Sequence, residues 1–406
     1  MTNTAITPDD LHNYAEVLAW ALEGSRGRRQ RHGELVVVRY DHLAKPLVEA
    51  LFARLTDAHL NVALRPLPTP LMQGERCLNS SFGQLAYPVP GEAELYAAAA
   101  ALLTIYAPED LLHLAHVDPR ILSEAEKAEQ GAGGADGPRA VLDRRLRAGA
   151  CGAVSCLWPT PALAAAAGLE ASEYEHEFLR ACWLNMPDPV AEWRRLARES
   201  AAVCARLDGL NAQLFRVESE DLDLEIFPGD NRRFLGVTGR NLPGCEVYLA
   251  PDARRTRGVY VSDQPSIVQG RVVQGVRLEF HDGVAVRASA ERGDGFLQWR
   301  LRLDAGARRV GEFSLTDARF SRVGRFMAHV LLDENRAGNC HLALGSAVTA
   351  SFSGPPEVLG PELAADLGFN ASSIHWDLVN TGPKTVTAHL PGGGRTVVFE
   401  GDRFVL

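Results

Sequence analysis

The spacing of apolar residues along this chain changes near residue 207, and that change limits the folds available to it. Before this point, short apolar runs alternate with segments in which apolar residues recur every three or four positions. This alternation predicts an open α/β sheet with flanking helices. Beyond it, apolar and polar residues alternate in short segments separated by Gly, Pro and Asp, which predicts strands joined by turns. We therefore expect an α/β domain over residues 1–206 and a β-rich α+β domain over residues 207–406.

The N-terminal half contains a βαβ pattern. A helix should begin at Pro8, because Thr7 has the residue type of an N-cap and Asp10 stands at the third helical position. Strand-like runs at 34–40 and 61–67 flank a second helical segment. Two strands that flank a helix in this way usually pair in parallel, which supports the open sheet.

Four further segments are predicted from local pattern alone. The Ala-rich residues 92–106 indicate a helix, since Ala has the highest helix propensity. The run LLHLAHV at 111–117 indicates a strand, and residues 281–283 (HDG) indicate the turn of a hairpin. A helical stretch is expected to return over 319–329.

Composition and charge argue against several kinds of partner. The formal net charge is −9, whereas nucleic acid and anionic membranes require clustered Lys and Arg. The N-terminal residues lack the features of a signal peptide, and no apolar run has the length of a membrane span. The seven Cys show no CxxC spacing, which favours a reducing compartment. We expect a cytoplasmic protein that binds neither nucleic acid nor membranes.

Five residues of the second half have the side chains of a divalent-metal site. His375 and Asp377 form an HxD pair, which a strand would place on one face. His341 lies between an apolar run and a Gly-containing turn. Glu246 and Glu312 each adjoin a strand-like run, where an acid is costly to bury unless it is paired or bound to metal. Together, three carboxylates and two imidazoles would neutralise much of the charge of two divalent cations.

Plainer interpretations exist for each of these residues. A single His at position 341 is more often a core residue than a ligand, and either Glu alone is compatible with a solvated carboxylate at a strand end. Cys245 and Cys340 would offer thiolate ligands to zinc. On a strand, however, each Cys would face away from the neighbouring Glu246 or His341, so we expect buried thiols instead.

The chain resembles the thermophilic aminopeptidase family of metallopeptidases, the aminopeptidase T and S type, over nearly its full length. Four blocks in the family's order and near its spacings carry the resemblance: GRNLPGCEVYLAP, GARRVGEF, LLDENRAGNCHLALGSA and SSIHWDLVNTGP. Position by position, the resemblance implies that the metal ligands are Glu246, Glu312, His341, His375 and Asp377. These residues are the ones already selected on chemical grounds.

The resemblance also implies an activity and an assembly. It implies removal of N-terminal residues from a peptide substrate with a free N-terminus, by a water activated by two divalent ions (cobalt, zinc or manganese). Glu312 is the candidate bridge between the ions and the candidate catalytic residue. The resemblance further implies that residues 207–406 form the catalytic metal-binding domain and that the protein is a homodimer.

One position departs from the family's pattern in a way that bears on catalysis. In the family, the His of the third block is followed by ALG and then by a Tyr thought to stabilise the developing oxyanion, whereas this chain has Val348 there. Loss of one such donor costs about 2.7–4 kcal/mol of transition-state stabilisation. Three alternatives stay open: an active aminopeptidase, a metal-dependent hydrolase of another substrate, and a metal-binding homologue with little catalysis that acts in binding or assembly.

Overall fold

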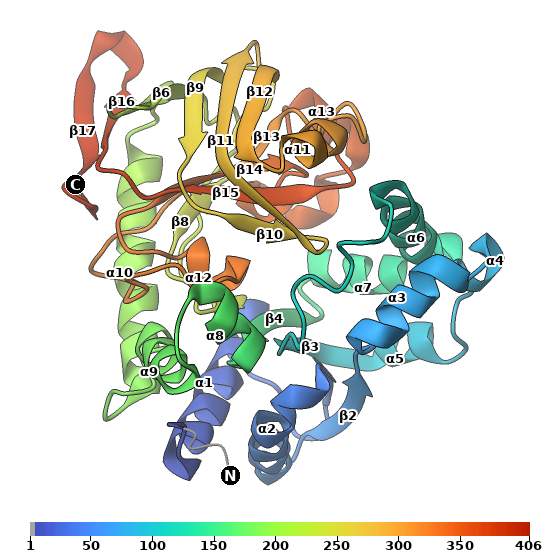
Figure 1. Cartoon of the computed structure of the whole chain (residues 1–406). Helices are drawn as coiled ribbons and strands as arrows, with labels where there is room; N and C mark the ends of the chain where they lie inside the picture. The colour runs from blue at the N-terminus through green and yellow to red at the C-terminus, as the bar shows by residue number, and fades with distance from the viewer. Residues whose placement is uncertain (1–4) are drawn as a thin grey trace. The chain divides into compact units, whose positions relative to one another are not determined.

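The computed structural model describes residues 5–406, which form two compact units. Unit 1 contains the chain up to Trp193 together with residues 238–244 and 269–271. Unit 2 contains residues 194–237, 245–268 and 272–406. Figure 1 labels the helices and strands of both units. Unit 1 holds a parallel sheet and unit 2 holds antiparallel sheets, so the expected mixture of α/β and β-rich structure is present.

Unit 1 is built on a five-stranded parallel sheet in the order β2-β1-β3-β4-β7. Its strands are β1 (Leu35–Tyr40), β2 (Asn61–Pro66), β3 (Ala99–Tyr106), β4 (Gly152–Leu157) and β7 (Asn241–Leu242). The inner strand β3 is buried along nearly its whole length, as is usual for a parallel sheet covered on both faces. The predicted βαβ pattern is confirmed, because β1 and β2 pair in parallel and α2 (Lys45–Asp57) connects them.

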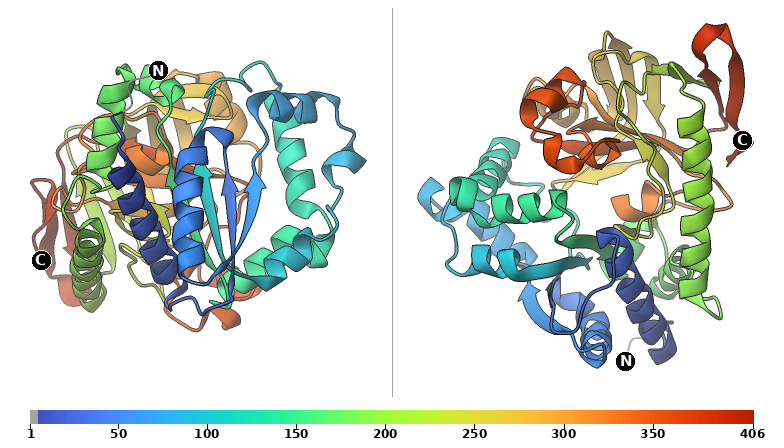
Figure 2. Two further views of the ribbon diagram at one scale, coloured as in Figure 1. Left: turned by 90° about the horizontal axis from the view of Figure 1, so that it is seen from below. Right: turned by 180° about the vertical axis from the view of Figure 1, so that it is seen from behind.

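Helix α1 (Pro8–Arg26) shows how the local sequence sets helix boundaries. It begins as predicted, with a capping box in which the Thr7 side chain accepts from the Asp10 amide and the Asp10 carboxylate accepts from the Thr7 amide. It ends at Gly27, whose φ of 75° suits a residue without a Cβ. The buried face of α1 packs against α2 and β4, and Figure 2 shows α1 and α2 side by side.

The other helices of unit 1 are α3 (Pro70–Asn79), α4 (Phe82–Leu85), α5 (Glu92–Ala98), α6 (Pro119–Gly131), α7 (Pro138–Arg147), α8 (Pro161–Ala167) and α9 (Ala171–Ala181).

Two of the local predictions in unit 1 are wrong. The helix predicted over 92–106 ends at Ala98, and the remainder is strand β3. The helix propensity of Ala is a weak preference, and burial between two neighbouring strands outweighs it. The segment 111–117 is a series of turns rather than a strand. The Asp110 carboxylate accepts from the Leu112 amide at 2.7 Å, and this local bond favours a turn.

Unit 2 contains a nine-stranded sheet, in which β12 pairs with β11 and the other strands follow the order β10-β11-β9-β6-β5-β16-β17-β18. Its strands are β5 (Leu214–Glu218), β6 (Asp223–Ile226), β9 (Arg257–Ser262), β10 (Ser266–Val268), β11 (Arg271–His281), β12 (Val284–Arg292), β16 (Thr385–His389), β17 (Arg395–Glu400) and β18 (Arg403–Phe404). The hairpin predicted at 281–283 is confirmed between β11 and β12. Its turn has positive φ at Asp282 and Gly283, which is the two-residue geometry that a twisted hairpin favours.

Helices are short in unit 2 apart from α10 (Pro189–Gly209), which runs from unit 1 into unit 2. The others are α11 (Asp294–Arg300), α12 (Val330–Asp333) and α13 (Pro361–Asp366). The helix predicted over 319–329 is wrong, because that segment is irregular and α12 begins only after it. The Asp333 carboxylate accepts from the Met327 amide at 2.7 Å, and such a side-chain bond competes with helix formation.

A second sheet of unit 2 carries the residues that matter for chemistry. It is antiparallel, with the order β15-β14-β13-β8, and its strands are β8 (Val247–Leu249), β13 (Val310–Leu315), β14 (Cys340–Gly345) and β15 (His375–Asn380). All residues of β8, β13 and β14 are buried. Within residues 5–406, no helix has the length and apolar character needed to cross a membrane.

Candidate metal centre

The five candidate ligands lie on, or directly before, the strands of this four-stranded sheet. Glu312 pairs with Ala343, which in turn pairs with Asp377. His341 and His375 each lie two residues from this row along their strands, and Glu246 directly precedes β8. Since side chains alternate between the two faces of a strand, the register places all five on the same face.

Ala343 lies between Glu312 and Asp377 in the row and is fully buried. Its methyl group leaves space above the sheet in which the longer acidic and imidazole side chains meet. Gly311 lets its own backbone lie close to the backbone at the end of β14, because a Cβ there would lie 2.4 Å from the carbonyl oxygens of Gly345 and Ser346. A residue with a side chain would therefore not fit at this position, directly before Glu312.

The side chains of these residues converge around the two imidazoles, and both Glu312 and Asp377 approach each of them, since Asp377 Oδ1 also lies 3.9 Å from His341 Nε2. At the first imidazole, His341 Nε2 lies 3.2 Å from Glu312 Oε1 and 3.3 Å from Glu246 Oε2. At the second, His375 Nε2 lies 3.9 Å from Glu312 Oε2 and 3.4 Å from Asp377 Oδ1. The two oxygens of one carboxylate thus face two different imidazoles. The structure brings together every residue that the sequence selected.

Backbone carbonyls orient both imidazoles. His341 Nδ1 lies 3.2 Å from the carbonyl oxygen of Glu334, and His375 Nδ1 lies 2.9 Å from that of Ser346. When Nδ1 carries the proton and donates it to these oxygens, the Nε2 lone pair of each ring is directed at the carboxylates. In metal-binding His residues, the ring nitrogen that does not contact the metal typically donates a hydrogen bond in this way.

Two residues that support the site were missed by sequence reasoning. Ser314 lies on the same face as Glu312, and its hydroxyl donates to Glu246 Oε2 at 2.8 Å. Because residues two apart on a strand point to the same face, its position two residues after Glu312 predicts that it lies beside the candidate ligands. Tyr260 of β9 donates its hydroxyl proton to the carbonyl oxygen of Leu378 at 2.6 Å and lies 3.0 Å from that of Cys340. No local pattern could have identified Tyr260, because this contact joins two different sheets.

Burial of the acidic groups has a large electrostatic consequence. Glu246, Glu312 and His341 are 7%, 5% and 0% exposed. Burial raises the pKa of Glu246, and the nearby charge of Glu312 raises it further. Burial alone would raise the pKa of Asp377, but the positive charge of His375 lowers it below its usual value. The group therefore needs positive charge close by to keep its carboxylates ionised.

Protons on the imidazoles supply part of that charge in the metal-free protein. Burial tends to lower the pKa of His341, but the hydrogen bond with Glu312 and the charges of Glu246 and Asp377 raise it to about 9. The pKa of His375 also rises above its usual value, because Asp377 and Glu312 outweigh the effect of burial. A cation bound among the same carboxylates would replace these protons.

The donor set fits divalent transition metals. Ligand atoms of Glu246, Glu312 and His341 all lie within 4.8 Å of one another. Carboxylate oxygen and imidazole nitrogen are the donors that zinc, cobalt and manganese accept in proteins. His375 and Asp377 offer a second group of the same chemistry on the other side of Glu312.

The Cys residues do not belong to this donor set. Both Cys245 and Cys340 are fully buried, as expected from the sequence. Burial raises the pKa of the Cys340 thiol to about 12, so at neutral pH the thiol stays protonated and is a poor metal ligand. The backbone amide of Cys245 instead donates to the Asn335 side chain at 2.5 Å, which holds the turn before Glu246.

Comparison with known proteins identifies one family model. The model of the thermophilic metalloprotease (M29) family matches residues 7–404. Aminopeptidase T of Thermus aquaticus is 30% identical over 235 residues, which cover 55% of this chain and 56% of the relative. Aminopeptidase PepS of Streptococcus thermophilus is 26% identical over 243 residues, which cover 57% of this chain and 58% of the relative. The aligned part thus spans a little over half the length of these relatives.

A solved structure is similar over almost the whole chain. The structure of wild-type AmpT from Thermus thermophilus superposes with a TM-score of 0.81, covering 97% of this chain and 99% of the other at 22% sequence identity. At this sequence identity the similarity establishes the fold alone and says nothing about the activity.

The uncompensated acids of the site predict an unusual effect on stability. In protein freed of metal by a chelator, we expect Glu246→Gln to raise the free energy of unfolding at pH 7 by about 1–2 kcal/mol. Burial and the charge of Glu312 raise the pKa of Glu246 to about 8, so at pH 7 the carboxyl must take up a proton or bury a charge when the chain folds, and Gln requires neither. The measurement is urea unfolding followed by tryptophan fluorescence. Glu220→Gln, at an exposed carboxylate, is the matched control and should change stability by less than about 0.5 kcal/mol. A clear loss of stability in Glu246→Gln would contradict this interpretation.

Proposed function

The chain belongs to the thermophilic metalloprotease (M29) family, and from this premise we propose that it is a metal-dependent aminopeptidase that removes N-terminal residues from peptides. The matched relatives named as aminopeptidases support this proposal. The family assignment confirms the resemblance inferred from the four sequence blocks.

One observation carries the proposal: the carboxylate of Glu312 lies between two imidazoles. Its Oε1 is 3.2 Å from His341 Nε2, and its Oε2 is 3.9 Å from His375 Nε2. Glu246 adjoins the first imidazole, and Asp377 lies nearer to the second, at 3.4 Å, than to the first, at 3.9 Å. This arrangement supports a site for two divalent ions, cobalt, zinc or manganese, in which Glu312 would be the bridging ligand and the principal catalytic residue.

The chain's own residues have separate tasks in this proposal. Two bound divalent ions would polarise the scissile carbonyl and lower the pKa of a water. His341 and His375 present Nε2, because Glu334 and Ser346 hold the opposite nitrogen of each ring. Ser314 fixes the orientation of Glu246 through its hydroxyl.

The donors of the site suit a substrate with a free amino group. Its neutral amine would bind one of the divalent ions or donate a hydrogen bond to one of the three carboxylates. His375 is the most exposed member, with 37% of its side chain accessible, and it marks the side from which a substrate would approach. An exposed N-terminus would thus be bound beside the reacting carbonyl, which confines cleavage to the first residue.

Several further features form part of the same proposal. Residues 207–406 would be the catalytic domain, since all five candidate ligands lie there. We propose a cytoplasmic homodimer that acts on peptides, on the basis of family membership.

Val348 favours a second candidate function, a metal-dependent hydrolase of another substrate or a metal-binding homologue with little catalysis. Val348 directly precedes the 3-10 turn Thr349–Ser351, which follows β14. It stands two residues after Ser346, whose carbonyl oxygen holds His375. The side chain of Val348 has no hydroxyl to donate to an oxyanion, so another donor would have to act in its place.

Removal of the bridging carboxylate tests the proposal directly. With leucine p-nitroanilide and protein loaded with cobalt, zinc or manganese, we expect turnover by the unaltered chain and a loss of roughly 10³-fold in Glu312→Gln, since bound metal contributes several kcal/mol to the transition state. Glu357→Gln, at an exposed carboxylate, is the matched control and should retain full turnover. Metal content measured on the same samples should fall in Glu312→Gln only. Full turnover in a chelator, or in Glu312→Gln, would refute the proposal.

Restoring the missing hydroxyl separates the two candidate functions. For a weakened aminopeptidase, we expect Val348→Tyr to raise kcat by roughly 10²-fold, the value of one oxyanion donor. Val348→Phe adds the same ring without the hydroxyl and should give no such gain. If both variants behave alike, the missing hydroxyl does not limit this reaction, and the altered-substrate function gains support.

A further inference from the structure

The carboxylate of Asp304 joins the loop before β13 to the segment that leads into β15. Its oxygens accept from the hydroxyl of Ser372 at 2.8 Å, from the hydroxyl of Ser373 at 2.6 Å and from the amide of Ser373 at 2.8 Å. They also accept from the amide of Gly306 at 2.9 Å. Hydrogen bonds to a charged acceptor are stronger than those between neutral groups, so this network holds the two segments together firmly.

The network requires a carboxylate. Burial tends to raise the pKa of Asp304, but the hydrogen bonds from Ser373 and Ser372 lower it below its usual value, so the group is ionised at neutral pH. Oδ1 accepts from the backbone amide of Gly306, and Oδ2 accepts from that of Ser373. An Asn side chain has a single acceptor oxygen, and its amide group would direct N–H donors at one of these backbone amides.

A short series of contacts links this network to the ring of His375. The Ser372 hydroxyl accepts from the Ile374 amide at 3.2 Å, and the Ile374 carbonyl oxygen accepts from the Ser346 amide at 2.6 Å. The carbonyl oxygen of Ser346 in turn lies 2.9 Å from His375 Nδ1. A shift at Asp304 would therefore move both the backbone of His375 and the carbonyl oxygen that orients its ring.

Close packing leaves these segments little freedom to adjust. The Asn370 side chain donates to the carbonyl oxygens of Gly306 and Gly345, at 2.8 and 2.6 Å. A Cβ on Gly306 would lie 2.0 Å from the carbonyl oxygen of Ala371. The loop before β13, the end of β14 and the start of β15 are thus fixed against one another, and the Asp304 carboxylate is the charged group among these contacts.

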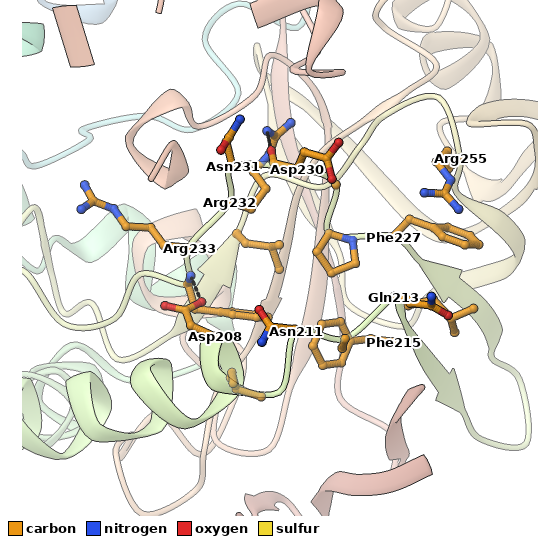
Figure 3. Close-up of a pocket in the computed structure, with 17 residues that line it drawn as sticks. Asp208, Asn211, Gln213, Phe215, Phe227, Asp230, Asn231, Arg232, Arg233 and Arg255 are labelled. Carbon is orange, nitrogen blue, oxygen red and sulfur yellow. Dashed lines mark hydrogen bonds between the residues drawn. The ribbon is translucent and has the colours of Figure 1, made fainter. Parts of the chain in front are cut away.

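The beginning of the same segment is anchored separately, by Arg232. Its guanidinium donates to the carbonyl oxygen of Leu367 at 2.9 Å and stacks on Phe369, with 3.4 Å from its central carbon to the ring centre. Figure 3 shows Arg232 among the residues that line a cavity of about 550 Å³. Arg232 therefore holds the chain before residue 370, and Asp304 holds the residues directly before His375.

We propose that Asp304 is a positioning residue of the metal centre, whose carboxylate fixes His375 where the imidazole can bind a divalent ion beside Asp377. His375 has 37% of its side chain accessible, whereas His341 has 1%. Surrounding side chains therefore restrain His375 less, and its position depends more on the backbone that carries it. The inference rests on the two-ion site of the proposed function and is independent of the substrate.

Cobalt binding to protein freed of metal tests this inference, by calorimetric titration and by metal content after gel filtration. We expect the unaltered chain to bind two ions. Asp304→Asn should bind the first ion normally and the second at least roughly tenfold more weakly, as for other residues that orient a metal ligand. Ser373→Ala removes one hydroxyl at an exposed position. It should give a smaller loss in the same direction, which decides the matter if Asp304→Asn folds poorly.

Asp263 offers a matched control at the other end of β15. Its carboxylate accepts from the Thr381 amide at 3.0 Å and from the Thr381 hydroxyl at 2.8 Å, directly after the strand ends at Asn380. Asp263→Asn therefore removes a similar carboxylate that holds the same strand, and it should leave the affinity for both ions unchanged. Equal weakening of the second ion in both variants would assign Asp304 a merely structural role and overturn the inference.

A second measurement needs no metal. In metal-free protein with isotopically labelled histidine, the Nδ1 proton that His375 donates to Ser346 should give a slowly exchanging NMR signal, assigned by its absence in His375→Ala. We expect Asp304→Asn to lose this signal and Asp263→Asn to keep it. An unchanged signal in Asp304→Asn, or unchanged affinity of that variant for both ions, would overturn the inference. Fewer than two ions in the unaltered chain would refute the proposed function, and the NMR signal would still decide the role of Asp304.

Discussion

The position of one carboxylate, Glu312 between His341 and His375, is the constraint on which the chemistry of this chain depends. Strand register brings these residues from β13, β14 and β15 to one face of a single sheet. Backbone carbonyl oxygens then direct each imidazole at the carboxylate. A local change in the backbone, such as a side chain at Gly311, would therefore disturb the site without touching a ligand.

This arrangement places function in opposition to stability. Three carboxylates gathered at a largely buried position repel one another, and burial makes that repulsion stronger than it would be in water. The protein partly compensates by raising the pKa of His341, and the Ser314 hydroxyl satisfies one oxygen of Glu246. Neither supplies the full positive charge that the cluster requires, and two divalent ions would do so.

Much of the fold and of the site could be predicted from sequence, wherever a local pattern determined the outcome. The cap at Thr7, the hairpin at 281–283 and the alternation that places His375 and Asp377 on one face are of this kind. The Ala-rich residues of β3 predict a helix, because their burial between neighbouring strands cannot be inferred until those strands are known. Other features depend on residues that are distant in sequence, so no spacing pattern predicts them. An example is the contact of Tyr260 with β14 and β15.

Anomalous X-ray diffraction at the zinc absorption edge, from crystals grown with zinc, would test the central claim most directly. The account predicts two anomalous peaks on either side of the Glu312 carboxylate, at the usual ligand distances of about 2.0–2.2 Å. One should contact Glu246 and His341, and the other His375 and Asp377. A single peak on one side of Glu312, or none near these five residues, would contradict it.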